Sequence, residues 1–571
     1  MNASNSNQTI VNSAIASTRS AFVGVAVLSA LSNVLMLVSP LFMMQVYDRV
    51  LGSRSMPTLF ALSVLALLIY IAAGLIEVLR SKIMQQIGRK LDEQLSDPVF
   101  EAVLKLPLKG ANGNSASMPL RDLDQIRQFM SGPGPLAVFD LPWLPLYLGI
   151  LYLFHPLFGI AAIGGALVLI FLTLVNEFTL RGPTKRLANL SANRWEIAEA
   201  GRRNADTLHA MGMRGAYARR FNGVHQNYIE ENLKSSGATA TYSAASKMFR
   251  QALQSGMLAL GAGLVIEQMA SPGAIIAASI LTSKALQPIE MVISQWRGFL
   301  SARQSIARLQ QTFKDLHFQP TEMKLPAPRN SFSVAGLAVV APSDNRVIVQ
   351  DVSISLFAGQ GLGIIGPSGS GKSSIARALT GVWPTARGTI RLDGAAINQW
   401  DSEALGSFVG YLPQTVELFE GTIAENISRF SASATPDEVI SAARLAGVHE
   451  LVLSLPQGYD TRVGGAGALL SGGQRQRIGL ARAMFGNPFL IVLDEPNANL
   501  DAEGELALAA AVAAARNRGA IVVLIAHRPN ILQAVDHVMV IQDGRMAAFG
   551  PRDEVLRKTT VQPVAQGRMS A

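Results

Sequence analysis

Six apolar stretches, each long enough to cross a lipid bilayer, constrain the fold of this chain more than any other feature. They cover residues 21–44, 58–79, 136–154, 157–176, 252–270 and 273–293. About 20 apolar residues are enough to span roughly 30 Å of hydrocarbon. Hydrophobic residues make up 49% of the chain and charged residues only 16%, which is more apolar than an average soluble protein. The sequence therefore predicts an all-α membrane domain of six helices over 21–310, preceded by a cytoplasmic tail over 1–20.

The distribution of Lys and Arg predicts the orientation of this domain. Residues 80–135 hold eight of these bases and 177–250 hold twelve, whereas the turns around His155-Pro156 and Ser271-Pro272-Gly273 hold none. The positive-inside rule places the basic segments in the cytoplasm, and both chain termini with them. Helical patterns over 122–130 and 202–221 predict that the membrane helices extend into the cytoplasm. A simpler interpretation is that the bases only fix the topology and bind lipid headgroups.

Lys284 is the ionisable residue closest to the middle of a predicted span. A charge at that depth is costly unless it is paired or faces water, so the hypothesis is that Lys284 lines a transport pathway. The alternative is that the boundary of the sixth span is misplaced and Lys284 lies near the membrane surface.

The net charge of +9 does not indicate nucleic acid as a partner, because the bases are spread between apolar runs rather than gathered on one face with aromatic residues. The chain has no cysteine. Disulfides, thiolate metal sites and cysteine nucleophiles are therefore excluded.

A different composition begins after a linker assigned to 311–331, which contains Pro320, Pro326 and Pro328. Short β-rich runs at 362–365, 489–493 and 521–525 alternate with alanine-rich helical patterns. This alternation predicts an α/β domain around a largely parallel sheet. The domain is expected to cover 332–560, followed by a C-terminal tail over 561–571.

A phosphate-binding loop follows the first of these runs. The segment from Gly366 to Ser373 matches the pattern GxxxxGK[ST] in full, with a predicted strand before it and a helix after it. Backbone amides of such a loop wrap the phosphates of ATP, Lys372 reaches the β and γ phosphates, and the Ser373 hydroxyl coordinates Mg²⁺. The predicted ATP-binding residues of this segment are Gly366, Pro367, Ser368, Gly369, Ser370, Gly371, Lys372, Ser373 and Ser374.

Two acidic residues at the end of an apolar run complete the candidate hydrolytic site. Asp494 ends the run as a second predicted Mg²⁺ ligand, and Glu495 follows it as the candidate general base for the attacking water. His527, at the end of the next apolar run, is the candidate that holds the water and the phosphate in position. An isolated His at a strand end is usually structural, but this one follows the Asp494-Glu495 pair at the expected place.

The segment Leu470-Ser471-Gly472-Gly473-Gln474 opens a helical pattern and is similar to the signature of ABC ATPases. Together with the motifs above, Gln414 in Tyr411-Leu412-Pro413-Gln414 and Asp501 in Asn499-Leu500-Asp501 make the whole chain resemble ABC exporters. The resemblance implies a homodimer in which ATP lies between the phosphate loop of one subunit and the signature of the other. It implies that Gln414 is a ligand of both ATP and Mg²⁺. It also implies that the following residues bind the ATP of the other subunit: Ser471, Gly472, Gly473, Gln474 and Asp501.

Longer segments resemble the bacterial type I secretion exporters of proteases and lipases, namely 366–371, 400–401, 410–414, 417–427 and 494–501. That resemblance implies an inner-membrane exporter of unfolded proteins with a C-terminal signal, such as calcium-repeat proteins. It also implies a periplasmic adaptor and an outer-membrane channel as partners. A lipid or small-molecule exporter of the same architecture is the alternative, and a non-transporting ABC ATPase fits six membrane spans poorly.

Two positions depart from the exporter pattern. Many exporters stack a tyrosine on adenine, where this chain has Val340-Ala341-Pro342-Ser343. Arg346, with its planar guanidinium, is the candidate substitute. Gly465 stands where a glutamate is common, so one contact with the partner's coupling helices is expected to be absent.

Overall fold

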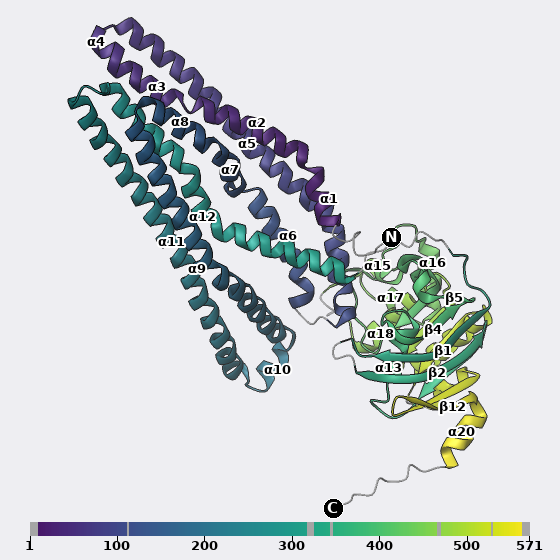
Figure 1. Ribbon diagram of the computed structural model, residues 1–571. Helices are drawn as coiled ribbons and strands as arrows, with labels where there is room; N and C mark the ends of the chain where they lie inside the picture. The colour runs from purple at the N-terminus through teal and green to yellow at the C-terminus, as the bar shows by residue number, and fades with distance from the viewer. Residues whose placement is uncertain are drawn as a thin grey trace, which may run out of the picture. The chain divides into compact units, whose positions relative to one another are not determined.

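A computed structural model describes residues 9–110, 114–316, 325–342, 346–464, 470–526 and 529–561. The chain divides into two compact units, one formed by Met1–Pro107 with Ala111–Phe318 and the other by Leu108–Gly110 with Gln319–Ala571. In its described residues the first unit is helical, and the second contains all the strands (Figure 1).

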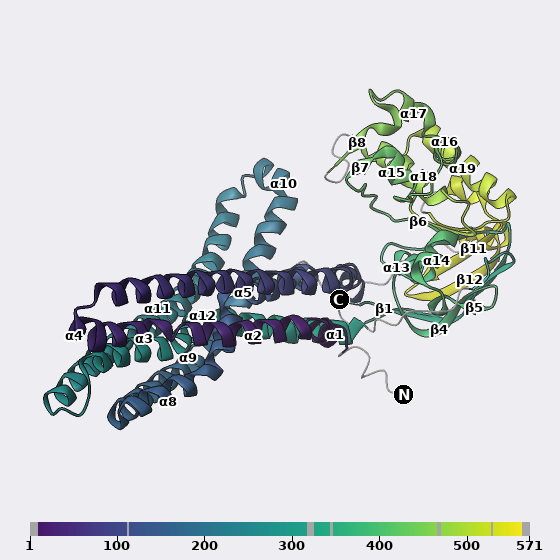
Figure 2. The same ribbon diagram turned by 90° about the horizontal axis from the view of Figure 1, so that it is seen from above.

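Long helices that lie side by side make up the first unit (Figures 1 and 2). Short helices precede, connect or extend them. In chain order the α-helices are α1 (Thr9–Ser17), α2 (Arg19–Leu35), α3 (Val38–Gln45), α4 (Leu51–Ser53), α5 (Met56–Lys105), α6 (Asn114–Met130), α7 (Pro133–Asp140), α8 (Leu144–Phe154), α9 (Pro156–Arg203), α10 (Ala205–Ala210), α11 (Arg214–Ile266) and α12 (Pro272–Leu316), with a π-helical turn at Val46–Val50 between α3 and α4.

Proline starts the second helix of each predicted hairpin. Pro156 is the first residue of α9, and the His155 side chain accepts a hydrogen bond from the Leu157 N–H at 3.2 Å. Helix α12 begins in the same way at Pro272. Proline suits this position because the first N–H groups of a helix have no partner within it. Both predicted turns therefore occur where the sequence places them.

Five segments of the described chain are long and apolar enough to cross a membrane: Arg19–Ser53, Met56–Lys109, Pro133–Phe154, Pro156–Arg203 and Pro272–Leu316. They contain five of the six predicted spans. The predicted span 252–270 does not meet this criterion, because α11 ends at Ile266 and the rest of that helix is largely polar. Helix α11 packs along α9 and α12. A sixth span over 252–270 stays a prediction.

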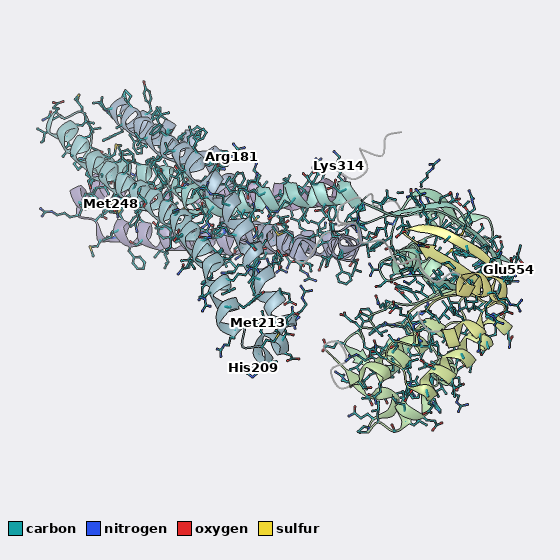
Figure 3. The ribbon with its side chains drawn as sticks, turned by 90° about the horizontal axis from the view of Figure 1, so that it is seen from below. Arg181, His209, Met213, Met248, Lys314 and Glu554 are labelled. Carbon is teal, nitrogen blue, oxygen red and sulfur yellow. The ribbon has the colours of Figure 1, made fainter. Side chains whose placement is uncertain are left out.

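The structure corrects the predicted helix over 202–221. Helix α9 ends at Arg203, α10 is a separate short helix, and α11 begins at Arg214. Asn204 ends α9, and its side chain donates a hydrogen bond to the Ala200 carbonyl at 2.8 Å. Figure 3 shows His209 and Met213 at the resulting turn between α9 and α11. The other predicted helix, over 122–130, lies within α6.

Two predicted boundaries of the helical domain also shift. Helix α12 continues to Leu316, beyond the predicted start of the linker at 311, because Leu309, Phe313 and Leu316 prolong its buried face. Part of the predicted tail over 1–20 is helical, since Val11 and Ala14 of α1 are buried in the same apolar cluster. Apolar packing therefore extends the helical unit at both ends.

The second unit is built on a six-stranded sheet with the spatial order β12-β11-β3-β10-β9-β6. Its strands are β3 (Gly361–Ile365), β6 (Val409–Leu412), β9 (Leu490–Asp494), β10 (Ile521–Ile525), β11 (His537–Gln542) and β12 (Arg545–Pro551). Only β12 pairs antiparallel. Every residue of β9 and β10 is buried, as expected for the continuous apolar runs of a covered parallel sheet. The predicted fold class is confirmed.

A second, antiparallel sheet was not predicted. It has the order β2-β1-β4-β5 and consists of β1 (Ser331–Val340), β2 (Val347–Phe357), β4 (Thr385–Leu392) and β5 (Ala395–Ala396). A short pair, β7 (Gly421–Thr422) with β8 (Arg462–Val463), lies elsewhere in the unit. The α-helices of this unit are α13 (Lys372–Leu379), α14 (Ser402–Phe408), α15 (Ile423–Ile427), α16 (Pro436–Leu445), α17 (His449–Leu453), α18 (Gly472–Met484), α19 (Ala502–Asn517) and α20 (Arg552–Val561).

Candidate functional site

The predicted phosphate loop connects β3 to α13. Gly371 is the N-cap of α13 and has a φ of +100°, a conformation that residues with a side chain rarely adopt. A Cβ atom at Gly371 would also lie 2.6 Å from Val349 Cγ2 of β2. Glycine is therefore required where the loop enters the helix. The loop delivers the chain to a helix N-terminus, whose amide N–H groups attract anions.

Lys372 is buried at the base of this loop, with 5% of its surface exposed. Its ammonium group donates hydrogen bonds to the Gly366 carbonyl at 2.9 Å and the Pro367 carbonyl at 2.7 Å. Burial lowers the pKa of Lys372, although the nearby carboxylates of Glu495 and Asp494 oppose this effect. To contact a phosphate, the ammonium group has only to exchange these two carbonyls for phosphate oxygens.

Ser373 and Asp494 face each other across the start of α13 and the end of β9. The Ser373 hydroxyl donates a hydrogen bond to Asp494 Oδ1 at 3.1 Å. Asp494 is 1% exposed, and burial raises the pKa of its carboxyl group, while the hydrogen bond from Ser373 lowers it. A hydroxyl and a carboxylate oxygen at this separation fit Mg²⁺, which prefers oxygen ligands and takes one or two carboxylates beside phosphate oxygens.

Glu495 follows β9 directly and lies beside Gln414. Its N–H donates to the Ile525 carbonyl of β10 at 3.1 Å, and its Oε2 atom accepts a hydrogen bond from Gln414 Nε2 at 3.1 Å. Gln414 follows β6, which pairs parallel with β9. Because the carboxyl ends of parallel strands meet at one edge of a sheet, the sheet itself brings Gln414, Asp494 and Glu495 together.

A cavity of about 330 Å³ adjoins the phosphate loop. It is lined by Arg346, by Pro367, Ser368, Gly369 and Ser370 of the loop, and by Asp543 with Gly544. The candidate adenine contact Arg346 thus lies next to the predicted phosphate site. Ser374 lies in the first turn of α13. Three predicted positions, Ser343, Gly465 and His527, lie outside the described residues.

The signature segment forms a fixed start to α18. Ser471 is the N-cap, and its hydroxyl accepts a hydrogen bond from the Gln474 N–H at 3.2 Å, while Gln474 Oε1 accepts from the Ser471 N–H at 2.8 Å. This reciprocal pair is a capping box. A Cβ atom at Gly473 would lie 2.7 Å from the Asn499 carbonyl oxygen, so only glycine allows the helix to approach the segment that follows β9.

Gln476 of α18 joins this helix to the segment after β9 by hydrogen bonds. It was not among the residues predicted from the sequence. It is 2% exposed. Its amide donates to the Pro496 carbonyl at 2.6 Å and the Glu495 carbonyl at 3.2 Å, and accepts from the Asn499 N–H at 3.1 Å. Gln476 lies three residues after Gly473, on the same face of the helix, and this helical spacing could have pointed to it.

Asp501 is held by the same region. It forms an ion pair with Arg477 of α18 at 2.7 Å and accepts a hydrogen bond from the Gly504 N–H at 2.9 Å, which caps α19. The hydrogen bond from Gly504 and the charge of Arg477 hold the pKa of Asp501 below its usual value. The signature helix and the residues beyond Glu495 are therefore joined by Gln476 and Arg477.

Comparison with known proteins identifies the family. Residues 22–288 match the family model of the ABC transporter transmembrane region, and residues 349–498 match the ABC transporter family model. The Type I secretion system ATP-binding protein PrsD of Rhizobium meliloti is 49% identical over 560 residues, which are 96% of each chain. The chain belongs to the type I secretion ABC transporters. The resemblance stated from its motifs is confirmed.

Other relatives of this ABC transporter agree. The Cyclolysin secretion/processing ATP-binding protein CyaB of Bordetella pertussis is 27% identical over 93% of this chain and 75% of its own. A bacterial Atm1-family ABC exporter with ATP bound has the same fold, with a TM-score of 0.80 over 96% of this chain and 100% of that chain, at 23% identity. The chain is thus an ATP-hydrolysing membrane transporter, as predicted.

Proposed function

We propose that this transporter is the ABC component of a type I secretion system and uses ATP hydrolysis to export unfolded polypeptide across a bacterial inner membrane. The observation that carries the proposal is the 49% identity, over 96% of the chain, to a type I secretion ATP-binding protein. The charge distribution supports an orientation with both termini and the ATP-binding unit in the cytoplasm.

The geometry of the phosphate loop supports its role in binding Mg²⁺-ATP. Lys372 contacts the β and γ phosphates, and the amides of the loop cradle them. Ser373 and Asp494 hold Mg²⁺, supported by the 3.1 Å contact between their oxygens, and Gln414 is the third ligand. Mg²⁺ held by these residues would neutralise the Asp494 carboxylate, which is costly to keep charged because it is buried.

Glu495 is the general base in this proposal. It lies beyond the buried Asp494 and beside Gln414, where it accepts a proton from the water that attacks the γ phosphate. His527 is proposed to hold the water and the phosphate in position.

The proposed active form is a homodimer. Each chain carries one phosphate loop and one signature segment, and ATP is held by the loop of one subunit and by Ser471, Gly472, Gly473, Gln474 and Asp501 of the other. The side chain of Asp501 is 64% exposed despite its ion pair with Arg477. It therefore remains accessible to a second subunit.

The proposed cargo is an acidic polypeptide with calcium-binding repeats, and the proposed partners are a periplasmic adaptor and an outer-membrane channel. The bases of 80–135 and 177–250 attract acidic polypeptide by long-range electrostatics. Part of this charge is neutralised locally, since Arg186 pairs with Glu231 and Arg202 with Glu199. Asp-rich repeats stay unfolded without calcium because their charges repel each other, and they fold where calcium is present.

The purified chain in lipid nanodiscs tests this proposal. It is titrated with the C-terminal segment of a calcium-repeat protein, without calcium and at two salt concentrations, while binding and ATP turnover are recorded. We expect binding that weakens with salt and changes ATP turnover. Turnover that responds to lipids or small hydrophobic compounds, but to no polypeptide, would assign the chain to lipid or small-molecule export instead.

A further inference from the structure

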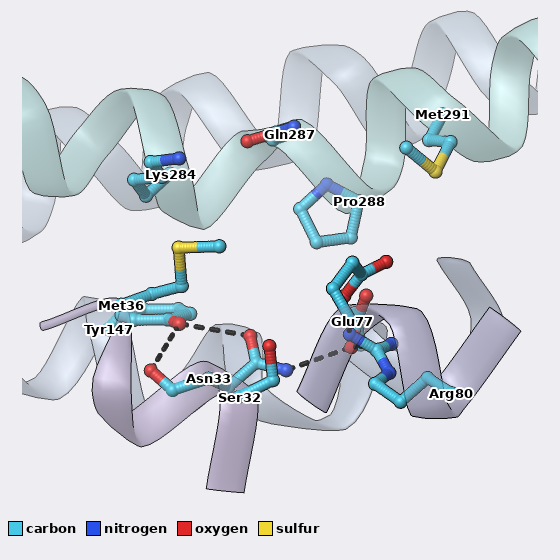
Figure 4. Close-up of a pocket in the computed structure, with 11 residues that line it drawn as sticks. Ser32, Asn33, Met36, Glu77, Arg80, Tyr147, Lys284, Gln287, Pro288 and Met291 are labelled. Atoms are coloured by element: carbon cyan, nitrogen blue, oxygen red, sulfur yellow. Dashed lines mark hydrogen bonds and ion pairs between the residues drawn. The ribbon is translucent and has the colours of Figure 1, made fainter. Parts of the chain in front are cut away.

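A polar pocket of about 200 Å³ lies within the helical unit, between residues of α2, α5, α7, α8 and α12 (Figure 4). Lys284 of α12 lines it, about 18 Å along the helix from Pro272 at roughly 1.5 Å per residue. This distance places Lys284 well inside a hydrocarbon layer of about 30 Å. Polar groups at such a depth usually serve a function.

One wall of the pocket is a network centred on Arg80, whose side chain is 3% exposed. Arg80 forms ion pairs with Glu77 at 2.9 Å and with Asp140 at 2.8 Å. Asp140 also accepts a hydrogen bond from the Asn33 amide at 2.8 Å, and the Tyr147 hydroxyl lies 2.8 Å from the Asn33 carbonyl oxygen. The network is anchored in four helices, so it forms a fixed wall rather than a mobile one.

The remaining charges lie at opposite ends of the pocket. Two carboxylates and one guanidinium leave the wall with one negative charge, and Lys284 supplies one positive charge. Figure 4 shows Lys284 near Gln287 at one end, and Glu77 below Pro288 towards the other. Among the described residues no ion pair involves Lys284, whereas Glu290 on the same helix pairs with Arg250 at 2.5 Å. The pocket is therefore neutral as a whole but has a donor end and an acceptor end.

An unfolded polypeptide inside a membrane needs such a site. Each residue carries an N–H and a C=O group, and each group without a partner in hydrocarbon costs several kcal/mol. We propose that this pocket holds the main chain of the polypeptide in transit, with carbonyl oxygens towards Lys284 and N–H groups towards Glu77. Gln287 between them can donate and accept. This inference rests on the proposed export of polypeptide.

The charge balance favours the main chain over an acidic side chain as the occupant. A carboxylate bound at Lys284 would neutralise the lysine and leave the negative charge of the wall uncompensated in a medium of low polarity. Peptide groups are neutral dipoles and leave the balance intact. A site of this kind binds segments of any sequence, as is needed if the whole exported polypeptide is to move through it.

Cysteine cross-linking tests the inference directly, because the chain has no cysteine of its own. Met36→Cys places a single thiol in the pocket, and Leu153→Cys places one at an 83% exposed position of α8 as the control. The probes are the C-terminal segment of a calcium-repeat protein with one cysteine, without calcium, and the same segment with every Asp replaced by Asn. With a mild oxidant added to accept the two electrons of disulfide formation, we expect both probes to form a disulfide with Met36→Cys and neither with Leu153→Cys.

Substitutions of Lys284 in the Met36→Cys chain then identify the bonded group. Lys284→Met, which removes the donor, should lower the cross-linking of both probes by about tenfold, whereas Lys284→Gln, which keeps a donor without the charge, should stay within about threefold. Lys314→Met, at an exposed position of α12 outside both the pocket and the two basic segments, is the control and should have no effect. Elution of each variant at the same volume as the parent chain in gel filtration shows that the variant is folded and has the same oligomeric state.

Three results would overturn the inference. An equal loss with Lys284→Gln and Lys284→Met, confined to the Asp-containing probe, would show that the pocket binds carboxylates. Unchanged cross-linking with Lys284→Met, or no cross-linking at Met36→Cys while the probe still alters ATP turnover, would remove the pocket from the path. A parent chain whose turnover responds to neither probe would contradict the proposed export itself, which distinguishes the two failures.

Discussion

Replacement of Glu495 by Gln is the sharpest test of the hydrolytic site, because the structure separates its chemical role from its structural one. Glu495 Oε2 accepts a hydrogen bond from Gln414, and a glutamine oxygen can accept the same bond. The backbone φ of +51° at this residue is equally demanding for Gln and Glu. Glu495→Gln should therefore fold normally and lose only the ability to accept a proton.

The expected loss in ATP turnover is at least a hundredfold. General-base catalysis contributes about 10²–10⁴ in rate, which corresponds to roughly 3–5 kcal/mol at about 1.4 kcal/mol per tenfold. Asp494 does not replace the missing base, because it is 1% exposed and bonded to Ser373. ATP binding should change little, since Lys372 and Ser373 are untouched.

Phosphate release at saturating Mg²⁺-ATP and equilibrium binding of a fluorescent ATP analogue measure the two effects separately. Glu554→Gln is the matched control, because Glu554 is an exposed residue of α20 paired with Lys558 (Figure 3), and its turnover should equal that of the parent. Turnover of Glu495→Gln within about tenfold of the parent would refute the general-base assignment. Loss of binding together with turnover would refute the claim that the substitution is structurally silent.

Lys372→Ala should instead abolish ATP binding as well as turnover, because Lys372 contacts phosphates in the ground state; analogue binding at parental affinity would contradict this. Without an aromatic ring, worth about 1–3 kcal/mol in base stacking, ATP and GTP should compete almost equally for the site. Strong selectivity for ATP that Arg346→Ala abolishes would show that Arg346 replaces the ring. Arg429→Ala should destabilise the ATP-binding unit by about 1–3 kcal/mol in thermal unfolding of the full chain, since the half-buried guanidinium donates to carbonyls of Gly406, Val409, Arg482 and Ala483; Arg444→Ala, at an exposed position, is the surface control. Burial tends to raise the pKa of Asp393, but hydrogen bonds from the Arg329, Ser331 and Asn330 amides bring it below its usual value. The stabilisation of the fold by the Asp393 carboxylate is therefore present above the unfolded pKa of about 3.9 and lost as pH falls through the folded pKa. Asp393→Asn should reduce the hydrogen-exchange protection of β1 at neutral pH. An equal reduction at pH below 3 would contradict the role of the charged carboxylate.

The sequence predicts those parts of the fold that a single segment determines. A bilayer requires long apolar helices, and a covered parallel strand is apolar throughout, so five spans and the strands β3, β9 and β10 are found where their runs lie. The antiparallel sheet was missed because β1, β2 and β4 are half-exposed strands interrupted by irregular pairing. Their alternation is too weak to recognise without their partners.

In the candidate site, too, the sequence predicts what a single segment determines and not what depends on distant segments. The phosphate loop is a local motif, whereas the contact between Gln414 and Glu495 depends on the pairing of β6 with β9, which is a long-range feature. The spacing of Gln476 from Gly473 is a local signal, but its hydrogen bonds to the Glu495 and Pro496 carbonyls are long-range contacts. Arg80 was assigned to a basic cytoplasmic segment, yet the structure buries it against Asp140, a residue 60 positions away. Ion pairs between distant helices hide charges from any argument based on local composition.

Proteoliposomes with calcium enclosed can show whether ATP hydrolysis by this chain moves polypeptide across a membrane. The calcium-repeat segment is added outside without calcium, together with ATP, and external protease then removes whatever has not crossed. We expect protease-protected segment to accumulate with ATP in the parent chain and to be absent with Glu495→Gln. Protection that is equal with Glu495→Gln or without ATP, or no protection while lipid or a small hydrophobic compound is transported, would contradict ATP-driven transport of polypeptide.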